Sequence, residues 1–184
     1  MASKQAGVYG RGCSPSRRLL FGILKGVLIA AVASILLLIH HVARPHVAFL
    51  GRIPGTRRFS DLVRHEHNER IPGVLAFRVE SGIVYFNVGH VFRVVLDRVE
   101  AELKTLRLVV CDLSTSPNID LAGAKMLLEL QTELAKRGVD LRLVEAHASV
   151  RDLLWIEGAE DRVGRIDRFA TVADVIEDFQ KNAT

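Results

Sequence analysis

The chain has 184 residues, a formal net charge of +4 and two cysteines, and its length suits one domain of ordinary size. Much of the positive excess lies before residue 71, which points to a membrane surface rather than a nucleic-acid groove, because no basic cluster follows Pro72. Cys13 and Cys111 form neither a disulfide framework nor a zinc-binding spacing, which is typical of a domain in a reducing compartment.

The first two predicted segments are a disordered leader at 1–18 and a transmembrane helix at 19–43. The leader is rich in Gly, Ser and Arg and has no apolar period. The run 19–39 is apolar apart from Gly, Ser and Lys25, and its length suits a helix that crosses a bilayer. A signal peptide is the main alternative, since a basic stretch precedes the run, and a buried helix is another. Positive charges flank both ends, so charge does not decide the orientation.

The segment 44–72 is predicted to be a linker. Pro45, Pro54, Gly55 and Pro72 all fall within it, and these residues block long regular elements. The linker therefore separates the membrane segment from a folded domain at 73–184.

From residue 73 onward, apolar patterns typical of strands and of helices alternate. This alternation predicts an α/β domain with a mostly parallel or mixed sheet of about four to five strands, packed by about four helices. The expected strands are 74–79, 83–86 after a tight turn at 80–82, 106–111, 139–144 and a short edge strand at 165–169. The expected helices are 92–103, 121–137, 149–158 and 172–179. Ser149 and Thr171 have capping-box spacing, and Trp155 is expected in the core.

The segment 106–123 carries the candidate site. Its first half is almost continuously apolar, which favours a strand buried on both faces. The chain then turns polar, and Asp120 is a suitable N-cap for a helix that begins at Leu121. Sites in open α/β folds lie beyond the carboxyl ends of strands. The candidate regulatory or partner loop therefore comprises Asp112, Ser114, Thr115, Ser116 and Asp120.

The same residues carry a family resemblance. Asp112-Leu113-Ser114, followed by Asp120-Leu121-Ala122-Gly123, resembles the signature loop of STAS domains. These domains occur in bacterial anti-sigma factor antagonists and at the C-terminus of SulP-type sulfate/anion transporters. In the antagonists the two positions after the second Asp are typically serines, one of which is phosphorylated. Here they are Leu121 and Ala122, so that phosphoswitch does not carry over.

The linker carries a second and more specific resemblance, to SulP transporters. Their last membrane helix is followed by a segment that resembles 44–73 in order and spacing. The matching groups are Arg44-Pro45, Leu50-Gly51-Arg52, Pro54-Gly55-Thr56, Arg64-His65 and Ile71-Pro72-Gly73. The chain is thus similar to the last transmembrane helix plus the STAS domain of such a transporter.

Other chemistry-bearing residues have plainer interpretations. The histidines at 65 and 67 lack the HExxH spacing, which favours a solvated polar stretch over a metal site. Asp112 and Asp120 are the acids expected near one another, in structural roles more than in acid/base catalysis. The hydroxyls at 114–116 are expected to be exposed, where a helix N-terminus would tolerate added phosphate. The sequence has no Gly-rich phosphate loop, although nucleotide binding is proposed for some STAS domains. We expect no catalytic residue, metal or cofactor.

The resemblance implies a non-enzymatic cytoplasmic regulatory module, held at the inner membrane by a single helix. Its expected partner is a transporter membrane core or another cytoplasmic protein, and not nucleic acid. Without the other membrane helices of a SulP transporter, the chain is not expected to transport by itself. The alternative is a membrane-tethered partner switch similar to an anti-sigma factor antagonist, and an enzyme is the third possibility.

Overall fold

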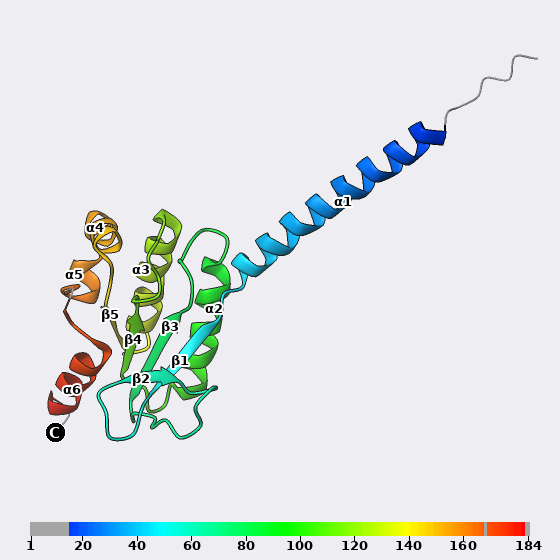
Figure 1. Cartoon of the computed structure of the whole chain (residues 1–184). Helices are drawn as coiled ribbons and strands as arrows, with labels where there is room; N and C mark the ends of the chain where they lie inside the picture. Colours follow the sequence, from blue (N-terminus) through cyan, green and yellow to red (C-terminus); the bar gives the residue numbers. More distant parts are fainter. Residues whose placement is uncertain (1–14, 168, 183–184) are drawn as a thin grey trace, which may run out of the picture. The chain divides into compact units, whose positions relative to one another are not determined.

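The computed structural model describes residues 15–167 and 169–182, and its chain divides into two units between His40 and His41. The described part of the first unit belongs to helix α1 (Pro15–Ala43) (Figure 1). Its segment Gly22–His40 has a mean hydropathy of 2.5 and buries none of its residues. Nineteen residues span about 28 Å as a helix, close to the thickness of a bilayer core. The predicted apolar helix is confirmed, although it begins at Pro15, within the predicted leader, whose residues 1–14 lie outside the described residues.

The second unit is built on a mixed five-stranded sheet within the described residues. The strand order is β2-β1-β3-β4-β5, in which β1 pairs antiparallel with β2 and β3, and β3, β4 and β5 are parallel. The strands are β1 (Val47–Arg52), β2 (Phe59–Asp61), β3 (Val74–Val79), β4 (Leu108–Asp112) and β5 (Asp140–Val144). All five residues of β4 are buried, as its unbroken apolar run predicts.

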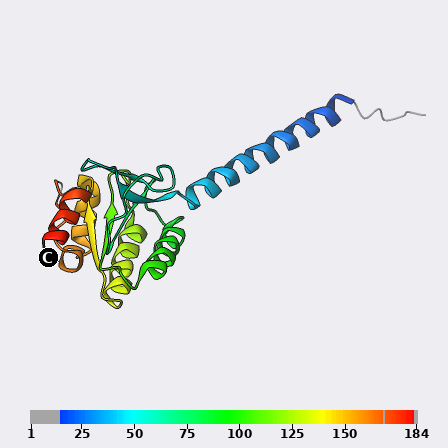
Figure 2. The same ribbon diagram turned by 90° about the horizontal axis from the view of Figure 1, so that it is seen from below.

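Helices cover both faces of the sheet (Figures 1 and 2). Alternate residues of β4 divide between two cores: Val109 and Cys111 join one, and Leu108 and Val110 join the other. The larger core lies under α2 (Val88–Glu102), α3 (Leu121–Ala135), α4 (Ala148–Ile156) and α5 (Glu160–Val163). The smaller core lies under α6 (Val172–Asn182). This architecture confirms the predicted fold class, with the four-residue α5 as an addition.

The largest difference from the predicted elements lies in the segment 44–72. It contains β1 and β2, and β1 pairs with β3 from Val47 to Leu50. The prolines do not prevent this, because the six residues of β1 fit between Pro45 and Pro54. The sheet therefore includes an antiparallel edge that the linker prediction missed.

Two predicted strands are wrong. Within 83–86, only Ile83 makes a bridge, to Ile119, and the chain then turns into α2. The apolar pattern was misleading because Ile83 is buried while Tyr85 and Phe86 face solvent. The predicted edge strand at 165–169 is not a strand at 165–167 or 169, and residue 168 lies outside the described residues.

Trp155 and Ser149 in α4 do not have their predicted roles, whereas the capping box at Thr171 forms as predicted. Trp155 is 69% exposed, so the prediction of a core anchor is wrong. Helix α4 begins directly after His147 with no side-chain cap, so Ser149 does not start it. The capping box at α6 is confirmed, because the Thr171 and Asp174 side chains each bond the other residue's backbone N–H.

Candidate functional site

The predicted loop leaves the carboxyl end of β4 and leads into the N-terminus of α3. At its start, Asp112 is fully buried and lies opposite Arg78 of β3 in the parallel register. Its Oδ2 accepts hydrogen bonds from Nε and Nη2 of Arg78, the first at 2.8 Å. Its Oδ1 accepts from the backbone N–H of Ser114 at 2.9 Å. Asp112 therefore joins two strands and fixes the first turn of the loop.

Arg78 was missed as a site residue in the sequence. The sequence signal for Arg78 was that it is the one charged residue in an otherwise apolar strand. A charged side chain is removed from solvent only when an oppositely charged group pairs with it. The sequence does not say which acid pairs with it, because 33 residues separate Arg78 from Asp112.

The three hydroxyl residues of the loop differ in exposure. Ser116 is fully buried, and its Oγ lies 2.9 Å from the carbonyl oxygen of Ser81. Thr115 is exposed, and its Oγ1 donates to the carbonyl oxygen of Val79 at 2.9 Å. Ser114 is half-buried, and its carbonyl oxygen lies 3.0 Å from Nε2 of His147. The prediction of three exposed hydroxyls is wrong for Ser116, whose modification would require the loop to open.

Asp120 ends the loop and caps α3, as predicted. Its Oδ1 accepts from the backbone N–H of Gly123 at 2.8 Å, and its Oδ2 accepts from the backbone N–H of Tyr85 at 2.8 Å. One carboxylate thus starts the helix and also holds the segment before α2 in place.

We expect Asp120→Ala to lower the free energy of unfolding by about 1 kcal/mol, since an N-cap contributes about that much. Urea unfolding of the full chain in detergent, followed by circular dichroism, measures the change. Asp97→Ala is the matched control, because Asp97 is an exposed acid on α2. Equal stabilities of the two variants would contradict the capping role.

The structure does not unite Asp112 and Asp120 as an acid pair, because each carboxylate bonds different groups. The negative charge of Asp112 acts instead on Glu145, which directly follows β5. Burial raises the pKa of Glu145, and the negative charge of Asp112 raises it further, while Arg78 opposes the rise. Glu145 also has a φ of +55°, a backbone conformation uncommon for residues other than glycine. Nothing in the sequence singled it out.

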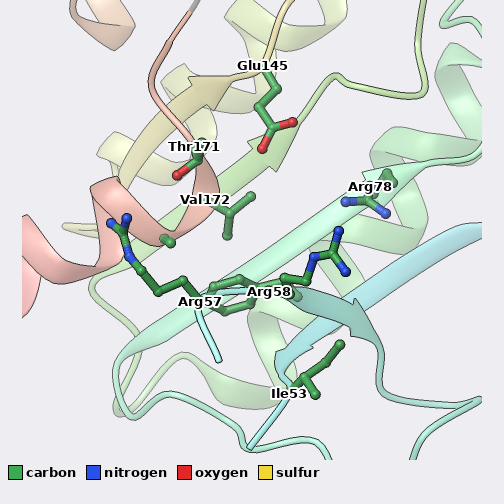
Figure 3. A pocket seen from close by; sticks show the side chains of 9 residues that line it. Ile53, Arg57, Arg58, Arg78, Glu145, Thr171 and Val172 are labelled. Atoms are coloured by element: carbon green, nitrogen blue, oxygen red, sulfur yellow. The ribbon is translucent and has the colours of Figure 1, made fainter. Parts of the chain in front are cut away.

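Glu145 lines a hollow of about 590 Å³ on the α6 side of the sheet (Figure 3). Arg78, the β1–β2 connection with Arg57 and Arg58, and Thr171 at the start of α6 also line it. Arg57 donates to Glu177 at 2.8 Å and to Asp174 at 2.7 Å. Bonds from Thr171 and then from Arg57 lower the pKa of Asp174 to about 2.

On the other side of the loop, apolar side chains face solvent around the start of α3. Tyr85, Phe86 and Leu121 are 73%, 63% and 47% exposed, and the two rings contact edge to face at 5.9 Å between centroids. Because Asp120 bonds the backbone of Tyr85 and precedes Leu121, the three lie together; we call them the apolar surface. Such a surface favours contact with another protein.

A comparison with protein families matches residues 67–175 to the STAS domain. High affinity sulfate transporter 2 of Stylosanthes hamata is 31% identical over 159 residues, which cover 82% of this chain and 24% of the transporter. A probable sulfate transporter of Mycobacterium tuberculosis is 27% identical over 160 residues, or 87% of this chain and 29% of the relative. The chain thus spans about a quarter of the length of these curated relatives.

Solved structures show the same fold. A murine Solute Carrier 26 anion transporter in the inward-facing state superposes with a TM-score of 0.74 at 22% identity, over 86% of this chain and 26% of the transporter. The SulP transporter STAS domain of Vibrio cholerae gives a TM-score of 0.51 at 17% identity, over 67% and 94% of the two chains. A putative anti-sigma factor antagonist of Thermotoga maritima gives 0.53 at 15% identity, over 61% and 92%.

Proposed function

Because this chain belongs to the STAS domain family, we propose that it is a non-enzymatic regulatory and interaction module of a SulP-type sulfate or anion transporter. Its sequence similarity to sulfate transporters covers 159 residues and so extends beyond the STAS match at 67–175. In this proposal, α1 crosses the inner membrane once and the domain lies in the cytoplasm.

The observation that carries the proposal is the apolar surface beside the candidate loop. Phe86 is 63% exposed and Leu121 is 47% exposed, although the domain has two apolar cores in which such residues can be buried. The ion pair of buried Asp112 with half-buried Arg78 and the cap at Asp120 give the surface a fixed backbone. A rigid apolar surface with polar residues around it suits docking on the cytoplasmic face of a transporter membrane core.

The residues of the loop have positioning roles in this proposal. Asp112 and Asp120 orient its two ends, Ser116 fastens it to the segment after β3, and Ser114 and Thr115 form the polar rim of the docking surface. The hydroxyls of Thr115 and Ser116 donate to backbone carbonyl oxygens, which favours a structural use over a nucleophilic one.

The test combines membrane fractionation, protease protection and cross-linked pull-down of the tagged full chain in its host. We expect an integral membrane protein with a protease-sensitive domain on the cytoplasmic side, and recovery of a SulP-type subunit. The double variant F86S/L121S should reduce that recovery about tenfold, because apolar residues at the centre of an interface dominate its affinity.

Val63→Ser is the matched control, because Val63 is an apolar residue that is 77% exposed and follows the edge strand β2, outside the apolar surface. It should leave recovery unchanged. Recovery of a kinase or an anti-sigma factor, with phosphate on Ser114 or Thr115, would replace the proposal with the partner-switch alternative. A soluble chain, or undiminished recovery by F86S/L121S, would also contradict it.

A further inference from the structure

We propose that the hollow on the α6 side of the sheet is a binding site for a small tetrahedral oxyanion, of the sulfate or phosphate class. It lies where the carboxyl ends of β3 and β5 meet the β1–β2 connection and the first residues of α6. Its volume of about 590 Å³ is within the range of small-ligand sites. The site is separate from the apolar surface, so the two proposals can fail independently.

Two guanidinium groups supply the hydrogen-bond donors. Arg58 is exposed and has no side-chain partner among the described residues. Arg78 uses Nε and Nη2 on Asp112, which leaves Nη1 available. Figure 3 shows the Arg58 guanidinium on the same side of the hollow as Arg78. Planar guanidinium groups match the oxygen spacing of sulfate and phosphate and bind them with charge-assisted hydrogen bonds.

Arg57 has a different task. Its guanidinium is bound to Glu177 and Asp174 of α6, and Figure 3 shows it on the α6 side of the hollow. These bonds tie the β1–β2 connection to α6 across more than a hundred residues of sequence. Arg57 therefore fixes the position of the β1–β2 connection, and this connection places Arg58 at the hollow.

The charged groups around the hollow couple anion binding to protonation of Glu145. Arg78 is paired with Asp112, and Glu145, whose carboxylate points into the hollow (Figure 3), is the acid among the residues that line it together with Arg58. Burial favours the neutral form of Glu145, so a proton on Glu145 and an anion on Arg58 favour each other. The charged groups facing Glu145 from the surrounding elements are Arg78 from β3, Asp112 from β4, Asp174 from α6, and Arg57 and Arg58 from the β1–β2 connection.

Calorimetric titration of the full chain in detergent with sodium sulfate tests the site, with sodium chloride at matched ionic strength as the blank. We expect saturable binding that Arg58→Gln weakens about tenfold, since it removes one charge-assisted contact. Arg93→Gln is the matched control, because Arg93 is an exposed arginine on α2, on the other face of the sheet. Inorganic phosphate should compete with sulfate.

The proton linkage has its own readout. Sulfate remains a dianion between about pH 8 and about pH 5, so a change of affinity in this range reports on the protein. Affinity should rise as the pH falls, and Glu145→Gln should bind more tightly at the higher pH with a weaker pH dependence. Absence of saturable binding by the wild-type chain, equal affinities of Arg58→Gln and Arg93→Gln, or an unchanged pH profile in Glu145→Gln would overturn the proposal.

Discussion

Asp112→Ala should lower the free energy of unfolding by about 3 kcal/mol, because it removes one partner of an ion pair whose acid is fully buried. Arg78 would keep its charge in a position only 26% exposed, without the carboxylate that compensates it. The backbone N–H of Ser114 would also lose its acceptor, so the first turn of the loop would loosen.

Urea unfolding of the full chain in detergent measures this loss, and Asp152→Ala is the matched control. Asp152 is an exposed acid on α4 and should change stability by less than about 0.5 kcal/mol. The double variant D112A/R78M restores an uncharged pair and should recover part of the lost stability. A loss for Asp112→Ala no larger than for Asp152→Ala would show that the pair does not stabilise the domain.

Gly123→Ala should destabilise the domain by about 2 kcal/mol, although alanine is the better helix former. A Cβ at this position would lie 2.3 Å from the carbonyl oxygen of Ile83 and 2.8 Å from Cγ2 of Ile119. These residues form the bridge that packs the segment before α2 against the start of α3. The backbone would have to move apart, which also strains the bond between Asp120 and Tyr85.

Gly89→Ala provides the contrast for this prediction. Gly89 lies in the first turn of α2, and a Cβ there would meet nothing within 4 Å. The substitution should therefore leave stability unchanged or raise it by up to about 1 kcal/mol. Thermal unfolding of both variants measures the difference, and a Gly123→Ala variant as stable as Gly89→Ala would refute the close approach.

The geometry around Gly123 also explains the spacing of the sequence motif that resembles the STAS signature. In Asp-Leu-Ala-Gly, the side chain of Asp120 accepts from the backbone N–H of Gly123, so the acid and the glycine lie within one turn of each other. The glycine leaves room for Ile83, while Leu121 faces solvent. The cap by the Asp120 side chain and the close approach at Gly123 therefore account for the motif, without a phosphate acceptor at Leu121 or Ala122.

The sequence by itself determined the elements whose signals are local. The continuous apolar run of β4, the apolar residues of α1, the cap at Asp120 and the capping box at α6 all depend on neighbours within one or two turns. Apolar runs indicate which residues are buried, and capping residues indicate where free backbone N–H groups find acceptors. The fold class and the ends of the candidate loop could therefore be predicted from these patterns.

Only the tertiary structure decided which distant groups meet. The pairing of β1 with β3, the partner of Arg78, the burial of Ser116 and the exposure of Phe86 each depend on register and packing between segments far apart in sequence. The hollow around Glu145 is the clearest case, because it forms where four separate segments converge. A side chain's charge and size can be read from the sequence, but its neighbours are set by long-range pairing, which local patterns do not encode.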